Sequence, residues 1–169
     1  MVPHRFVLRS AAAAALLALL SACGGGDGDL ATTTPSGGGA TPTAAQQSAF
    51  ISSYGGGLAA LNSYSGLTSP AFLDTIDDSF LDAGYTKEQI RAHLAQEATA
   101  RATTPDLVFP GVTLSNATIT DCDAKGFCTL TATVTNADAD STATTFTTRV
   151  RLQDSKVRLY GDQAQAPTV

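Results

Sequence analysis

The sequence predicts an α+β fold in which N-terminal helices pack on a curved antiparallel four-stranded meander. Between residues 44 and 103, apolar residues recur at three- and four-residue intervals, the period of an α-helix. From residue 112 onward the period falls to two and threonine becomes frequent, as on a pleated surface with one wet face. The connections between these later segments are short, which favours antiparallel neighbours.

The first expected helix spans residues 44–64. Its apolar positions follow helical spacing: Phe50, Tyr54, Leu58 and Leu61. Three glycines at 55–57 interrupt the pattern, and each costs about 1 kcal/mol relative to alanine inside a helix. The helix therefore either breaks at the glycines or is held together by packing.

Two further helices are expected before the sheet. Ser69 supplies a capping hydroxyl and Pro70 suits the first helical position, which predicts a short helix ending at about residue 81. Thr86 opens the next helix, with Gln89 completing a capping-box pattern. That helix ends around Pro105.

Four strands follow the helices. In the first, over residues 112–120, a slip in the apolar phase between Leu114 and Ala117 predicts a bulge. The other strands are expected at about 128–134, 146–152 and 157–159.

The N-terminus has the organisation of a secretory signal peptide, with Arg5 and Arg9 ahead of an apolar run at 11–20. The run is shorter than the roughly 20 residues that span a bilayer as a helix. The segment Leu20-Ser21-Ala22-Cys23 closes it and resembles the lipobox of bacterial lipoproteins. That resemblance implies removal of residues 1–22 and acylation of Cys23. Because Gly24 rather than Asp follows, it also implies an outer-membrane lipoprotein that faces the periplasm.

Cleavage after residue 22 leaves 147 of the 169 residues, enough for one domain with a core. Residues 23–43, rich in Gly, Thr and Pro, are expected to form a lipidated, disordered tether with a reach of roughly 25 Å. The single α+β domain is expected at 44–163 and a flexible tail at 164–169.

The net charge of the mature chain limits the partners that it can bind. Removal of Arg5 and Arg9 leaves eight basic residues against fifteen acids, a net charge of −7. A chain this acidic repels phosphate backbones, so we expect no nucleic-acid partner. The expected contact with the bilayer is the acylated Cys23 alone.

Two cysteines, Cys122 and Cys128, remain once Cys23 is assigned to lipid. An even pair in an exported protein predicts a disulfide, here closing a hairpin around Gly126. Metal binding would need further ligands, and a redox-active pair usually has the spacing Cys-x-x-Cys.

The order of elements and the closing segment Val157-Arg158-Leu159-Tyr160-Gly161-Asp162 resemble the nuclear-transport-factor-2-like, or cystatin-like, cone fold. The resemblance implies a concave sheet that can enclose a pocket, in a family of both isomerase-like or dehydratase-like enzymes and binding modules. The chain departs from many members because no separate early strand is evident between the helices and the meander.

The candidate ligand-binding residues are Arg149, Arg151 and Tyr160, of which the arginines share one strand face. They can hold an anion, but strand alternation already explains the arginines as residues that keep an outer face soluble. His93 on the third helix is interpreted as structural or solvated. The densest cluster of acids is Asp74, Asp77, Asp78 and Asp82, of which 74, 78 and 82 stack at four-residue spacing. Its register fails the calcium-loop pattern, so the cluster is interpreted as a solvated helical face.

No catalytic set, metal site or cofactor is predicted. The favoured hypothesis is therefore a non-enzymatic, membrane-anchored periplasmic domain that binds a small ligand or an envelope protein. The first alternative is a small cone-fold enzyme, which requires a carboxylate and a Tyr or His to converge with perturbed pKa values. The second is a structural envelope protein that self-associates, with a homodimer formed through the open sheet face.

Overall fold

The computed structural model describes residues 41–104, 111–137 and 142–164. The expected signal peptide, Cys23 and most of the expected tether lie outside these residues. Among the described helices, none combines the length and the hydropathy needed to cross a membrane.

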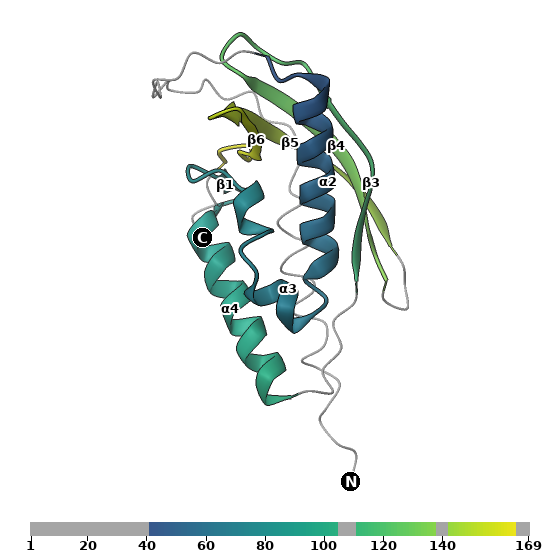
Figure 1. Ribbon diagram of the computed structural model, residues 1–169, viewed down its shortest axis with the longest axis vertical. Helices are drawn as coiled ribbons and strands as arrows, with labels where there is room; N and C mark the ends of the chain where they lie inside the picture. The colour runs from purple at the N-terminus through teal and green to yellow at the C-terminus, as the bar shows by residue number, and fades with distance from the viewer. Residues whose placement is uncertain (1–40, 105–110, 138–141, 165–169) are drawn as a thin grey trace.

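The C-terminal half is a four-stranded antiparallel meander, which confirms the predicted α+β class (Figure 1). The strands follow one another in space as in sequence: β3 (Val112–Thr120), β4 (Phe127–Asn136), β5 (Ala143–Gln153) and β6 (Lys156–Leu159). Alternate residues of β4 are buried, from Cys128 to Asn136. The predicted bulge is present in β3, where the pairing with β4 shifts between Ser115 and Thr118.

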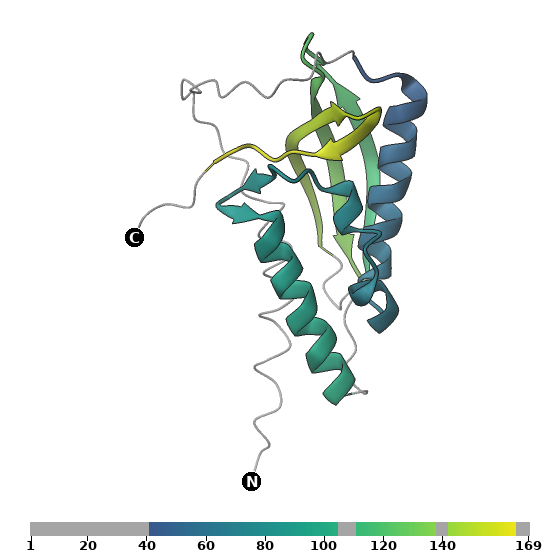
Figure 2. The same cartoon turned by 60° about the vertical axis from the view of Figure 1, so that its left-hand side comes forward.

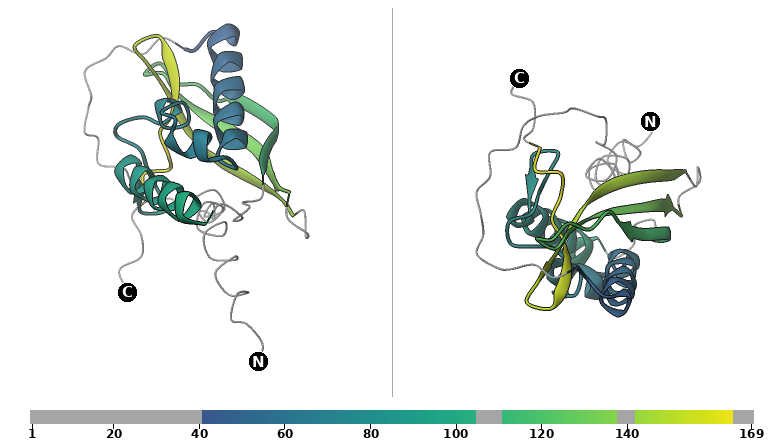
Figure 3. Two further views of the ribbon diagram at one scale, coloured as in Figure 1. Left: turned by 60° about the horizontal axis from the view of Figure 1, so that its bottom comes forward. Right: turned by 90° about the horizontal axis from the view of Figure 1, so that it is seen from above.

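Two long helices precede the sheet, α2 (Ala44–Ala60) and α4 (Lys87–Thr103), with the short α3 (Tyr64–Thr68) between them. Both long helices begin with a complete capping box, including the predicted Thr86–Gln89 pair. In Figures 1 and 2, α2 runs along the sheet, whereas α4 lies on the opposite side of the domain from β3 and β4. Seen from above in Figure 3, α2 lies on one side of the sheet only.

Helix α2 continues unbroken through its three glycines, so packing overrides propensity. A Cβ at Gly57 would lie 3.0 Å from the Cα of Phe72, and one at Gly55 would lie 3.5 Å from the Cβ of Leu114. The absence of a side chain at Gly57 lets the helix approach Phe72 closely, whereas a Cβ at Gly55 would make only ordinary van der Waals contact with Leu114. The helix ends at Ala60, four residues earlier than expected.

The helix expected from Pro70 to residue 81 is wrong. Only a single 3-10 turn, Leu73–Thr75, forms there, and after a turn at residues 78–79 the chain enters a small hairpin of β1 (Leu81–Asp82) and β2 (Tyr85–Thr86). Ile76 forms a parallel bridge with Leu159, and the N–H of Asp77 donates to the Leu159 carbonyl at 2.8 Å. The edge of β6 thus supplies backbone partners that a helix would have found within itself.

The disulfide joins Cys122 to Cys128 across the turn between β3 and β4, as predicted. Asp123 organises that turn because its Oδ1 accepts from the backbone N–H groups of Lys125 and Phe127. Gly126 provides the left-handed conformation that the turn requires, with φ 83°. The crosslink therefore fixes Phe127 at the start of β4.

Candidate functional site

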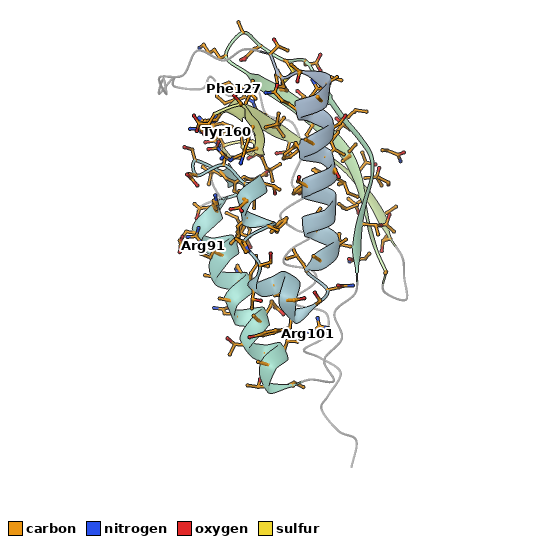
Figure 4. All side chains as sticks on the ribbon, in the orientation of Figure 1. Arg91, Arg101, Phe127 and Tyr160 are labelled. Carbon is orange, nitrogen blue, oxygen red and sulfur yellow. A yellow bond between two sulfur atoms is a disulfide. The ribbon has the colours of Figure 1, made fainter. Side chains whose placement is uncertain are left out.

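Four side chains from three parts of the sequence meet at one end of the sheet: Phe127, Arg149, Arg151 and Tyr160. We call them the arginine–aromatic cluster. Phe127 pairs with Arg151 in the β4–β5 register, and the Tyr160 N–H donates to the Arg149 carbonyl at 2.8 Å. The Phe127 and Tyr160 rings meet edge to face with centroids 4.9 Å apart, and both lie near β6 in Figure 4. The structure therefore brings the predicted Arg149, Arg151 and Tyr160 together.

Arg151 is buried in an ion pair with Asp77. Its Nε and one terminal nitrogen donate to the two carboxylate oxygens of Asp77 at 2.9 and 2.6 Å. The interpretation of Arg151 as a solubilising residue is therefore wrong, because this side chain is only 7% exposed and Asp77 is fully buried. The bidentate geometry fixes the guanidinium, whose centre lies 4.9 Å from the Tyr160 ring centroid.

Arg149 lies next to the Asp77–Arg151 ion pair but is not part of it. Its guanidinium lies 4.8 Å from the Phe127 ring centroid, a cation–π contact, and its side chain is partly exposed. No described carboxylate lies within ion-pair distance of Arg149, nor of Arg158, which stands opposite Arg151 on β6. The cluster is thus a positive site on an acidic protein, and the planar guanidinium of Arg149 suits a carboxylate or phosphate.

A second polar group lies inside the domain, where Asp82, Thr148 and Tyr54 are all buried. The Thr148 hydroxyl donates to Asp82 Oδ2 at 2.7 Å. Burial raises the pKa of Asp82 to about 6, and the charge of Asp162 adds to the rise while the Thr148 hydrogen bond opposes it. Burial also raises the pKa of Tyr54, with a further contribution from the charge of Asp82. A carboxyl and a phenol therefore influence each other inside the domain.

The two buried acids were both missed because residues 70–81 were expected to form a helix with a solvated acidic face. That placement is wrong for Asp77 and Asp82, while Asp74 and Asp78 are exposed. Asp78 bonds to Lys87 Nζ at 2.8 Å, and this contact lowers its pKa. Asp82 has apolar neighbours in Leu81 and Ala83, which was a weak signal for burial, whereas Asp77 is followed directly by Asp78 and carried no such signal.

His93 is exposed on α4 and contacts the Tyr85 ring at 6.3 Å between centroids. Within the described part of the chain, no group of three or more His, Cys, Asp or Glu residues is arranged to hold a metal ion.

A scan against protein-family profiles and a search of curated protein sequences find no match for the chain. Solved structures do resemble it. One is a protein of unknown function with a cystatin-like fold from Nostoc punctiforme, with 18% sequence identity, a TM-score of 0.46, and coverage of 72% of this chain and 91% of that chain. Another is Aln2 from a Streptomyces species, with 14% identity, a TM-score of 0.43 and the same coverage. These likenesses concern the arrangement of helices and sheet alone.

Proposed function

We propose that this protein is a lipid-anchored binding domain of the bacterial envelope that takes an anionic ligand at the arginine–aromatic cluster. In this proposal Cys23 holds the chain to the outer membrane, the tether separates the domain from the lipid surface, and Arg149 contacts the ligand. The observation that carries the proposal is the contrast between two neighbouring arginines. Arg151 is neutralised by Asp77, whereas Arg149 has no carboxylate partner among the described residues.

The chemistry of Arg149 favours binding over a purely structural role. The cation–π contact with Phe127 restrains the Arg149 side chain, so less side-chain freedom is lost when an anion binds to its planar set of N–H donors. The disulfide and the Asp77–Arg151 pair hold the surrounding groups in place before binding, which lowers the cost of ordering the site.

Binding of a simple anion tests the ligand site. We expect galacturonate, a carboxylate with several hydroxyls, to bind the full chain in detergent, as measured by calorimetric titration. Arg149→Ala should weaken binding roughly ten- to hundredfold, because a hydrogen bond to a charged group contributes about 1.5–3 kcal/mol. Arg91→Ala is the matched control, since Arg91 lies on α4 and pairs with Glu88 (Figure 4). Equal loss in both variants, or none in either, would contradict the proposal.

The anchor has its own test. Cys23→Ser should abolish incorporation of labelled fatty acid and release the protein from the membrane fraction. Cys122→Ser with Cys128→Ser is the matched control, because it removes the other two cysteines and should leave lipid labelling intact. Retention of label in the Cys23 variant would rule out the lipoprotein assignment.

A second candidate function rests on Asp82 and Tyr54. A carboxyl with a pKa of about 6 is able to take up and release a proton near neutral pH, which is the requirement for a general acid–base enzyme of the isomerase or dehydratase type. In that case a small substrate would be turned over, and Asp82→Asn would abolish turnover while Arg149→Ala would not.

A further inference from the structure

The outer face of the sheet continues from the arginine–aromatic cluster as a surface of hydroxyl groups. In the β4–β5 register Arg149 stands opposite Thr129, Thr147 opposite Thr131, and Thr145 opposite Thr133. The hydroxyls of Thr131 and Thr147 are 3.3 Å apart, and those of Thr133 and Thr145 are 3.1 Å apart. We call Thr129, Thr131, Thr133, Thr145 and Thr147 the threonine ladder.

Charge is distributed along this face in an unusual way. On the face that carries Arg149, no register position from Thr129 to Thr135 on β4 or from Ala143 to Thr147 on β5 is charged, and Arg149, Arg151 and Arg158 all lie at one end. A sheet face that only needs to be soluble normally mixes Lys, Glu and other charges of both signs. High strand propensity explains why threonine is tolerated here. It does not explain why none of the fifteen acids of the chain occupies one of these register positions on β4 and β5.

The dimensions of the face suit an extended ligand. Alternate side chains on a strand are about 7 Å apart, so the distance from Arg149 to Thr145 is about 14 Å. Neighbouring strands lie about 4.8 Å apart, which places two parallel rows of hydroxyls beneath such a ligand. Each hydroxyl both donates and accepts, as hydroxyl-rich ligands require.

We propose, resting on the proposed function above, that the ligand is an acidic polysaccharide strand. Its carboxylate binds the guanidinium of Arg149, and the sugar hydroxyls of the following units bond to the threonine ladder. A protein partner would require an apolar interface centre, which the ladder lacks. A lipid surface would require apolar side chains to insert, and the ladder offers none.

The length of the oligosaccharide is the variable that tests the polysaccharide assignment. We expect tetragalacturonate to bind the full chain in detergent at least about tenfold more tightly than galacturonate, with the additional affinity coming from the ladder. The double variant Thr131→Val and Thr147→Val removes two hydroxyls with little change of shape, and it should abolish the length effect while galacturonate still binds. Thr99→Val on α4 is the matched control and should leave both affinities unchanged.

Other outcomes would overturn the assignment in distinguishable ways. If galacturonate binds but the tetramer binds no more tightly, or if the double variant keeps the length effect, the polysaccharide assignment fails and the anion site stands. If a neutral dextran or glycerol phosphate binds as tightly as the tetramer, the acidic glycan is the wrong class. If neither uronate binds, this inference and the anionic-ligand proposal fail together.

Discussion

We expect the ionised carboxylate of Asp82 to lower the free energy of unfolding of the domain at pH 8. The pKa of this buried carboxyl rises from 3.8 to about 6 in the folded protein, which means that folding favours the protonated form. Stability from this group is therefore fully present below about pH 4 and is lost as the pH rises through about 6. At about 1.4 kcal/mol for each pKa unit, the rise corresponds to about 3 kcal/mol.

Asp82→Asn should remove this dependence. The amide oxygen can still accept from the Thr148 hydroxyl, and the amide nitrogen provides a donor beside the negative charge of Asp162. We therefore expect the variant to be more stable than the wild-type chain at pH 8, by up to about 3 kcal/mol. At pH 4.5 the two should differ much less, because the wild-type carboxyl is then mostly protonated.

Urea denaturation of both chains at pH values from 4.5 to 8 measures this difference. The comparison is between variant and wild type at each pH, because other groups, including the Asp77–Arg151 pair, also respond to acid. Asp74→Asn, at an exposed position, is the control and should show no such trend. A difference that stays constant over the pH range, or that grows toward low pH, would refute the reasoning.

Two further predictions concern stability. Asp77→Ala should destabilise the fold by about 3–5 kcal/mol in urea denaturation, because it leaves the Arg151 charge buried without its partner. A loss of stability below about 1 kcal/mol would contradict this prediction. Adjacent glycines should respond in opposite directions in thermal denaturation. Gly56→Ala should stabilise by up to about 1 kcal/mol since its Cβ meets nothing within 4 Å, whereas Gly57→Ala should destabilise since its Cβ would press on Phe72; the same sign in both would be inconsistent with α2 packing.

The strands and α4 could be predicted from the sequence because their signals are local. Alternation along β4 and the phase slip in β3 follow from the pleat itself. The Thr86–Gln89 capping box lies within one helical turn and forms as expected. In each case the residues that decide the structure are close together in the chain.

The segment from Pro70 to Asp82 could not be predicted in this way. Its partners are Leu159 and Arg151, the latter 74 residues away from Asp77, and no local pattern reports them. The same limit applies to the candidate site. Arg149 and Arg151 follow the same strand alternation, so the sequence alone does not distinguish them. The position of Asp77 does, because Asp77 forms a buried ion pair with Arg151 and leaves Arg149 with no carboxylate partner among the described residues.

The most direct measurement of the central claim is a nuclear magnetic resonance titration of the isotope-labelled full chain with galacturonate. We expect the signals of Phe127, Arg149 and Tyr160 to shift first, including the side-chain Nε–H of Arg149, and we expect Arg149→Ala to abolish these shifts. Shifts centred on Tyr54 and Asp82 would contradict binding at the arginine–aromatic cluster. So would the absence of shifts at galacturonate concentrations that show binding by calorimetric titration.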